Sequence, residues 1–185
     1  LTRSSAASDV YKRQFQWFPN PEINFEFYLD GLSGIMMVLI CSLSLVIQLF
    51  STSYMSKDEK YTKYFEYFNF FVFSMLLLVL SGNFLVMFFG WELVGLSSYL
   101  LISFWSEKKS ASRAGNKAFI LNRIGDFGFL IGLMMILNEF QTFNFLSIFN
   151  STLEKRPESL DIMILFLLLG AVSYTHLRAH ETDRY

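Results

Sequence analysis

The stretch from Phe84 to Trp105 constrains the fold of this chain more than any other. Its 22 residues, FLVMFFGWELVGLSSYLLISFW, are apolar almost throughout and contain one carboxylate, that of Glu92. About 20 apolar residues are enough to cross a bilayer as a helix. Glu92 is the ninth residue of the stretch. A rise of about 1.5 Å per residue then places it roughly 12 Å along the helix, near the middle of the hydrocarbon.

A carboxylate at that depth needs an explanation, because an ionisable group there costs on the order of 3 kcal/mol on insertion scales. Such groups usually face the protein interior or a water-filled cavity. One interpretation is that Glu92 takes up and releases protons inside the membrane. The alternative is a structural glutamate, hydrogen-bonded or permanently paired. Small and polar residues follow within a few turns and indicate an interior-facing side of the helix: Gly95, Ser98, Tyr99 and Ser103.

Long apolar runs alternate with short charged segments along the rest of the chain. Of its 185 residues, 53% are hydrophobic and 17% are charged, and the charges lie mostly between the runs. This pattern is typical of a polytopic helical membrane protein. We therefore predict an all-α fold, a polytopic transmembrane helix bundle. The expected spans are about 32–50, 64–80, 84–105 and 118–137, with a truncated span at 161–172.

The segments between the predicted spans alternate in charge. Segments 51–63 and 106–117 carry three and four basic residues, whereas 15–30 and the turn 81–83 carry none. The positive-inside rule places both basic segments in the cytoplasm or the mitochondrial matrix. On the opposite side, we expect 15–30 to be extended at the membrane surface. The Phe-rich part of 139–161 should form a short amphipathic surface helix.

The fourth predicted span contains the sequence NRIGD, with Arg123 and Asp126. Residues three apart on a helix can pair directly. Asp126 is the ninth residue of this span, so it should lie at the depth of Glu92 on the neighbouring antiparallel helix. A proton could pass between the two carboxylates through water, with Arg123 reaching toward the basic side. The alternative is a salt bridge that only joins helices. Gly128 and Gly132 form a GxxxG pattern, which predicts close helix packing.

Both ends of the chain look foreign to this bundle. Residues 1–14 are small and polar without periodicity, and residues 173–185 interrupt an apolar run. Each resembles translated adaptor sequence, so we interpret both as non-native scars and expect them to pack on nothing. The alternative is a genuine polar terminus. The remaining segment, 15–172, then has the character of an internal piece of a longer transmembrane protein.

Other classes of site have little support in the sequence. The net charge of −1 does not favour nucleic acid as a partner. Cys41, the one cysteine, lies in an apolar run and should be a small buried hydrophobe. We expect no metal site, no bound cofactor and no catalytic nucleophile, because the sequence has no Gly-rich phosphate loop and no cysteine cluster. The two histidines, His176 and His180, lie in the C-terminal scar.

Three motifs together resemble one known family in order and spacing. They are DGLSG at 30–34, GWELVGLSSYLLISFW at 90–105 and KAFILNRIGDFGF at 117–129. They resemble the chain 5 family of NADH–ubiquinone oxidoreductase, respiratory complex I, over residues 24 to about 172. Chain 4 of that complex and the large subunits of multisubunit Na⁺/H⁺ antiporters are similar around WEL, whereas NRIGD favours chain 5.

The resemblance implies an antiporter-like subunit that couples electron transfer from NADH to ubiquinone to proton pumping. It implies the mitochondrial inner membrane, or a bacterial plasma membrane, and other complex I membrane subunits and the lipid bilayer as partners. NADH, FMN, iron–sulfur clusters and ubiquinone would belong to the complex and not to this stretch, which alone is not expected to be active. Glu92 matches the family's intramembrane glutamate, and Arg123 and Asp126 match its Arg and Asp.

The family's glutamate pairs with a lysine on a later helix, and that helix is absent from this sequence. We therefore expect the desolvation of Glu92 to be uncompensated here, which favours the neutral carboxyl. Two alternatives stay open: a fragment of a multisubunit cation/proton antiporter, and a purely structural membrane subunit in which Glu92 and Asp126 are static.

Overall fold

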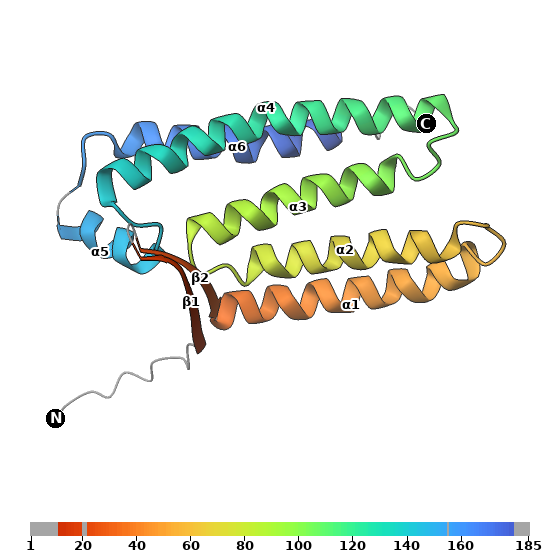
Figure 1. Cartoon of the computed structure of the whole chain (residues 1–185), viewed down its shortest axis with the longest axis horizontal. Coiled ribbons are helices and arrows are strands. Elements are labelled where there is room, and N and C mark those ends of the chain that lie inside the picture. Colours follow the sequence, from red (N-terminus) through yellow and green to blue (C-terminus); the bar gives the residue numbers. More distant parts are fainter. Residues whose placement is uncertain (1–10, 20–21, 155, 180–185) are drawn as a thin grey trace.

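The computed structural model describes residues 11–19, 22–154 and 156–179, and in them a two-stranded antiparallel sheet precedes a bundle of helices. The long helices lie side by side and alternate in direction, with the sheet and the short helix α5 at one end (Figure 1). The elements in chain order are β1 (Tyr11–Pro19), β2 (Glu22–Leu29), α1 (Gly31–Tyr54), α2 (Tyr61–Val79), α3 (Phe84–Ile102), α4 (Lys109–Phe140), α5 (Phe145–Glu154) and α6 (Leu160–Ala179).

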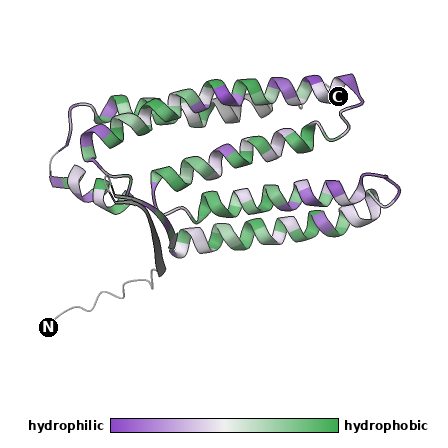
Figure 2. Cartoon of the chain, viewed as in Figure 1, coloured by the Kyte–Doolittle hydropathy of each residue, from purple (hydrophilic) through white to green (hydrophobic). Residues whose placement is uncertain are grey.

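The bundle has the composition of a membrane protein. Among the described helices, α1, α3 and α4 are long and apolar enough to cross a membrane. Figure 2 shows apolar residues over the middle of the helices and hydrophilic ones toward the ends. The second predicted span, α2, is not in this group; its tyrosines, Lys63, Glu66 and Asn69 lower its hydropathy. The predicted all-α transmembrane bundle is thus confirmed, with a β-hairpin added to it.

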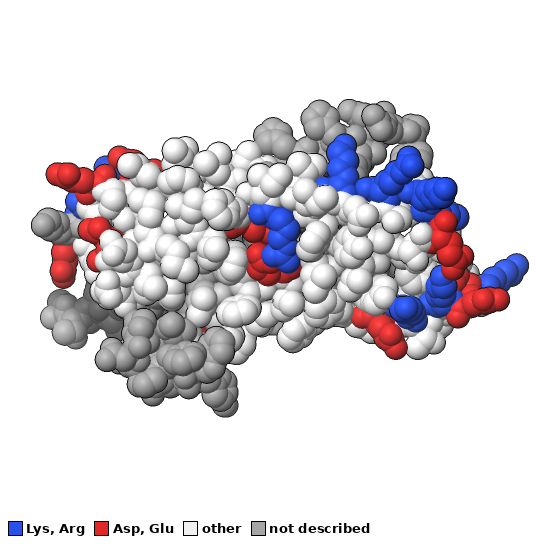
Figure 3. Space-filling view, turned by 45° about the horizontal axis from the view of Figure 1, so that its top comes forward, with Lys and Arg blue, Asp and Glu red and all other residues white. Residues whose placement is uncertain are grey.

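Both basic segments lie at the same end of the bundle. The α1–α2 and α3–α4 connections are at the end opposite the hairpin and α5 (Figure 1). Most basic side chains in the view of Figure 3 gather toward that end. We call it the basic end, and the other the hairpin end. This arrangement agrees with the alternation of basic and non-basic segments in the sequence.

The largest departure from the predicted boundaries is at the start of α4. The helix begins at Lys109, not near 118, so most of the predicted basic loop 106–117 is helical. Its alanines, lysines and arginine are strong helix formers and it contains no proline. Gly115 is buried there because the C-cap of α3, Ser103, packs against it. The connection from α3 to α4 is correspondingly short.

Part of each segment predicted to be a scar has regular backbone structure. In 11–14 the backbone pairs with β2, from Tyr11↔Leu29 to Gln14↔Glu26, so these four residues do contact the rest of the chain; the interpretation of 1–14 as a non-native scar stays a prediction. At the other end α6 continues without a break to Ala179, and the interpretation of 173–185 as a scar likewise stays a prediction. No proline or glycine interrupts the helix after Gly170. Residues 1–10 and 180–185 lie outside the described residues.

Helix α1 is the least enclosed of the long helices. Its buried residues are Ser33 and Ser51, and Cys41 is exposed, so the expectation of a buried cysteine is wrong. Polar side chains join α1 to α2: Gln48 Nε2 donates to Asn69 Oδ1 at 2.7 Å. A helix that shows apolar side chains on most of its surface is suited to a lipid environment.

The apolar core lies where α4 meets α6, near the hairpin end. Its buried members are Phe129, Leu133, Ile136, Phe143 and Met163. Small residues let the two backbones approach, as the GxxxG pattern predicts. A Cβ on Gly132 would lie 3.0 Å from Leu167 Cδ2, and one on Gly170 would lie 2.7 Å from Phe129 Cβ. This packing fixes α4, which carries half of the candidate site.

Candidate functional site

Helix α3 is set in place at its start and along its first half. Asn83 caps it, with its side-chain oxygen accepting from the Val86 N–H at 2.8 Å. Two turns on, Gly90 is buried against α2, where a Cβ would lie 2.7 Å from Leu78 Cα. This contact brings the two backbones together just before Glu92 and fixes the carboxylate near the middle of the helix.

Glu92 reaches across to α4 and forms an ion pair with Arg123, between Oε2 and Nη1. The Glu92 side chain is 19% exposed and that of Arg123 is 44% exposed. Figure 3 shows a group of adjoining basic and acidic atoms in the middle of an otherwise uncharged surface. The expectation that Glu92 would be desolvated without a counter-charge is therefore wrong. The structure supplies an arginine from the neighbouring span.

Asp126 is the second carboxylate within reach of Arg123. Its Oδ2 lies 3.9 Å from Arg123 Nη1, and its side chain is 10% exposed. The predicted i, i+3 pair exists, but the contact with Glu92 is the shorter one. The guanidinium also lies 4.9 Å from the ring centroid of Phe119, one turn toward the basic end. The predicted residues Glu92, Arg123 and Asp126 are thus brought together at one level of the bundle.

Trp91 is a site residue that sequence reasoning missed. Its indole N–H donates to Asp126 Oδ1 at 2.9 Å. A tryptophan in an apolar stretch is expected in any packed helix, so its type gave no reason to single it out. Its position could have indicated the contact, because Trp91 is next to Glu92 on a helix predicted to lie beside the helix of Asp126. A buried indole N–H usually has a hydrogen-bond acceptor.

The chemical character of the site follows from its charges. Two carboxylates share one guanidinium in the apolar middle of two spans, where electrostatic interactions are stronger than in bulk water. When one carboxylate takes up a proton, Arg123 keeps the other as its partner. The group can therefore hold a proton without leaving Arg123 unpaired. In a single buried pair, protonation of the carboxylate would leave the arginine without a counter-charge.

The predicted interior-facing side of α3 continues from Glu92 toward the basic end. Ser97 is fully buried and Ser98 is 6% exposed. The Ser97 hydroxyl donates to the Val94 carbonyl at 3.1 Å. Within the described residues the Ser98 hydroxyl has no hydrogen-bond partner. A buried hydroxyl of this kind is a position where an ordered water or a further helix would supply the partner.

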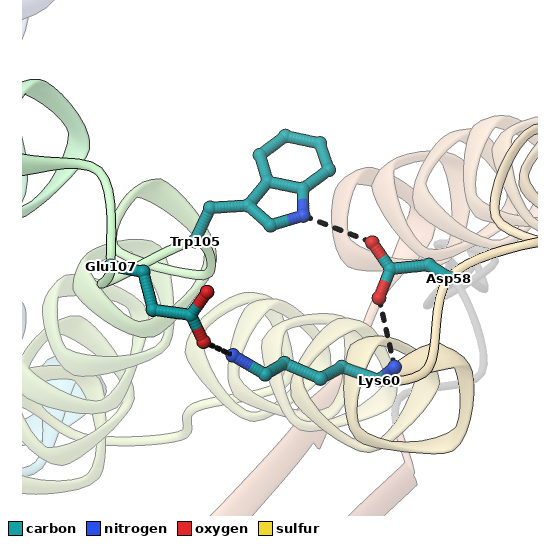
Figure 4. A network of polar contacts seen from close by, with 4 residues as sticks. All are labelled: Asp58, Lys60, Trp105 and Glu107. Atoms are coloured by element: carbon teal, nitrogen blue, oxygen red, sulfur yellow. Dashed lines mark hydrogen bonds and ion pairs between the residues drawn. The ribbon is translucent and has the colours of Figure 1, made fainter.

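A network of side chains joins the two connections at the basic end (Figure 4). Trp105 Nε1 donates to Asp58 Oδ2 at 3.0 Å, and Lys60 Nζ pairs with Glu107 Oε1 at 2.5 Å. The Trp105 hydrogen bond holds the pKa of Asp58 below its ordinary value. The Lys60–Glu107 bond raises the pKa of Lys60 and lowers that of Glu107. These groups are exposed to solvent, so the network contributes little to the free energy of unfolding. Its main effect is to hold the two loops in one arrangement.

The DGLSG motif has a local structural role at the other end of the molecule. Asp30 is the N-cap of α1 and forms a capping box with Ser33. Asp30 Oδ1 accepts from the Ser33 N–H at 2.8 Å, and the Asp30 N–H donates to Ser33 Oγ at 2.8 Å. The Ser33 backbone N–H is the main reason that the pKa of Asp30 is lowered. This motif begins a helix and lies far from Glu92 along the bundle.

Polar contacts at the hairpin end join three parts of the chain that are far apart in sequence. The Gly82 N–H donates to the Glu26 carbonyl at 2.7 Å, and Asn83 Nδ2 donates to the Asn24 carbonyl at 2.6 Å. The Glu26 carboxylate is buried and accepts from Asn144 Nδ2. The β2 strand, the α2–α3 turn and the segment before α5 therefore meet at one junction.

Comparison with solved structures shows that this arrangement of helices is a known fold. The chain superposes on a chain of the Mrp complex from Dietzia sp. DQ12-45-1b with a TM-score of 0.81 and 18% sequence identity. The match covers 89% of this chain and 18% of that one. At this identity the likeness concerns the fold alone.

Curated relatives are more similar in sequence. NADH-ubiquinone oxidoreductase chain 5 of Acanthamoeba castellanii is 40% identical over 162 residues, which is 82% of this chain and 24% of the relative. NADH-quinone oxidoreductase subunit L of Mycobacterium tuberculosis strain H37Rv is 36% identical over 173 residues, 92% of this chain and 27% of the relative. The chain thus spans about a quarter of the length of these relatives.

Two family profiles match the chain in succession. Residues 17–65 match the profile described as NADH-Ubiquinone oxidoreductase (complex I), chain 5 N-terminus. Residues 81–175, about half of the chain, match the profile described as NADH:quinone oxidoreductase/Mrp antiporter, TM, and this range contains Glu92, Arg123 and Asp126. The chain belongs to the NADH:quinone oxidoreductase/Mrp antiporter transmembrane family.

Proposed function

We propose that this chain is part of a proton-translocating membrane subunit of NADH:quinone oxidoreductase. Its place is the mitochondrial inner membrane, or the plasma membrane in a bacterium. The observation that carries the proposal is the ion pair of Glu92 with Arg123, with Asp126 beside it, in the apolar middle of two spans. The names of the relatives support the choice of enzyme complex.

The proposed cycle uses the three charged residues in sequence. A proton that reaches Glu92 neutralises its carboxylate and weakens its hold on Arg123. The guanidinium then moves toward Asp126, whose Oδ2 is 3.9 Å away. When Arg123 returns to Glu92, its positive charge favours the ionised carboxylate and the proton leaves. The cycle needs a proton path to each side of the membrane, which the longer subunit would complete.

Electron transfer is assigned to other subunits of the complex. Within the described residues, no three His, Cys, Asp or Glu side chains gather into a metal-binding group. In this proposal NADH, FMN, the iron–sulfur clusters and ubiquinone are bound elsewhere, and this chain contributes proton transfer only. Its partners are the neighbouring membrane subunits and the lipids around the bundle.

The direct test replaces Glu92 by glutamine in the intact complex. Glu92→Gln keeps the shape and removes the titratable group, so we expect an assembled complex that has lost coupled pumping. Glu92→Asp keeps the carboxylate on a shorter side chain and should pump in part. Glu66→Gln, an exposed carboxylate on α2, is the matched control. Protons pumped per electron are measured in vesicles with NADH as donor. A normal ratio in Glu92→Gln would make the glutamate structural and refute the mechanism.

A cation/proton antiporter is the second candidate, because the matched family includes Mrp antiporters and the fold superposes on an Mrp complex. The two functions differ in their driving force. A redox-driven pump moves protons when NADH is supplied and stops when quinone reduction is inhibited. An antiporter exchanges cations for protons without NADH, so sodium-driven proton movement in vesicles that lack NADH would favour it.

A further inference from the structure

Two consecutive residues of α3 each hold a charged residue of α4. Glu92 pairs with Arg123, and the Trp91 indole N–H donates to Asp126 Oδ1 at 2.9 Å. Consecutive side chains diverge by about 100° around a helix. The two contacts therefore bind α4 at Arg123 and Asp126, three residues apart. Together they fix the rotation of α3 relative to α4.

The direction of the indole N–H is fixed by aromatic packing. The Trp91 ring stacks with Phe129 at a centroid distance of 6.0 Å and an angle of 15°. Phe129 is 4% exposed and also stacks with Phe88 at 5.6 Å and 15°. Phe129 lies one turn from Asp126 on α4. The same helix thus provides both the surface on which the indole lies and the carboxylate that its N–H meets.

We propose that Trp91 is a positioning residue for Asp126. One carboxylate oxygen of Asp126 is held by the indole, and the other faces Arg123 at 3.9 Å. The indole can only donate, so this contact favours the ionised carboxylate. The hydrogen bond thereby opposes protonation of Asp126 and keeps its carboxylate turned toward Arg123 while the guanidinium is paired with Glu92.

This inference rests on the proposed function, because it explains how the guanidinium finds its second partner. Without the Trp91 hydrogen bond, the Asp126 carboxylate could rotate or take up a proton, and Arg123 would then have one anionic partner instead of two. Glu92 would bind a proton less readily, because doing so would leave Arg123 without a partner. The predicted result is a complex that assembles but pumps fewer protons per electron.

The test removes the N–H and keeps the ring. Trp91→Phe in the intact complex retains an aromatic surface against Phe129. A second variant places benzothienylalanine at position 91, in which sulfur replaces the indole N–H and the bicyclic shape is kept. The control is Trp105→Phe, since Trp105 also donates to a carboxylate, that of Asp58, but at the exposed basic end. Pumping per electron and the infrared C=O stretch of protonated carboxylic acids are measured for each.

A hydrogen bond to a charged group changes an equilibrium constant by at least about tenfold. We therefore expect both variants at position 91 to lose most coupled pumping at normal assembly. A protonated-carboxyl band should appear, and Asp126→Asn in the same background should remove it. Trp105→Phe should match the wild type. The benzothienyl variant keeps the test valid if Trp91→Phe assembles poorly.

The outcomes distinguish a failure of the positioning role of Trp91 from a failure of the proposed function. Normal pumping and no new band in the benzothienyl variant would refute the positioning role, even where Glu92→Gln still abolishes pumping. Normal pumping in Glu92→Gln would refute the proposed function itself. A loss of pumping in Trp105→Phe equal to that in Trp91→Phe would show that any lost indole N–H has this effect, and would also refute the positioning role.

Discussion

The packing of α3 against α2 leads to a prediction with an internal control. Gly90 and Gly95 lie on the same helix on either side of Glu92, and each can be replaced by alanine. At Gly90 a Cβ would lie 2.7 Å from both Cα and N of Leu78. At Gly95 a Cβ would lie 3.8 Å from Asn122 Nδ2, which is ordinary contact.

The size of the effect follows from these distances. Non-bonded carbon atoms settle at about 3.5–4.0 Å, so the two backbones must separate by about 1 Å to admit a methyl group at Gly90. Overpacking of this kind costs about 1–3 kcal/mol. Alanine also gains up to about 1 kcal/mol in helix propensity at either position. Gly95→Ala should therefore be neutral or mildly stabilising. Gly90→Ala should be less stable than Gly95→Ala by about 1–3 kcal/mol.

The assay is reversible unfolding of the chain in mixed micelles as the fraction of SDS rises, with helicity followed by circular dichroism. The two variants are compared with the wild type at the same lipid-to-protein ratio. Pumping in the intact complex gives a second measurement, because separation of α3 from α2 would displace Glu92. Equal unfolding midpoints for Gly90→Ala and Gly95→Ala would show that the α2–α3 contact does not limit stability, and the steric argument would then fail.

Three further predictions concern the charged groups. Arg123→Gln should abolish pumping and lower assembly more than Glu92→Gln does, because it leaves two carboxylates without a counter-charge; blue native gels of the complex measure assembly. Asp30→Ala should cost about 1 kcal/mol by removing the N-cap of α1. Since the pKa of Asp30 is lowered from 3.8, its contribution is present above that pH and lost as the pH falls through the lower folded value, which acid titration of wild type and variant would show. Lys60→Ala should leave the unfolding midpoint unchanged, because its partner Glu107 is solvent-exposed.

Depth along the helices was enough to predict that Glu92 and Asp126 lie close together. Both are near the middle of antiparallel spans, and consecutive spans in membrane bundles are usually neighbours. Which charged groups touch was not predictable in this way, because it depends on the rotation of α3 about its axis. That rotation is fixed by contacts such as Gly90 with Leu78. For the same reason the pairing of Arg123 with Glu92 and the hydrogen bond from Trp91 to Asp126 emerged only from the structure.

The boundaries of elements were predicted less well where tertiary contacts decide them. Hydropathy identified the apolar part of α4 but not its first two turns, which are charged and become helical through propensity and contact with the end of α3. The strand β1 pairs with β2 over residues that composition had marked as foreign. Strand formation depends on the backbone of a partner, so a short polar segment gives little sign of it in its own residues.

The junction at the hairpin end has a mechanical consequence for the ion pair. There the turn before α3 is joined to β2 and to the segment before α5 by backbone and buried hydrogen bonds, whereas the basic end is held by side-chain packing and exposed contacts. A rod anchored at one end swings as a lever, and its displacement grows with distance from the anchor. Glu92 is the ninth of the 19 residues of α3. Because α3 is also held at Gly90, two residues before Glu92, a sideways shift of the loop near Trp105 would turn the helix about that contact and move the carboxylate far less than the loop.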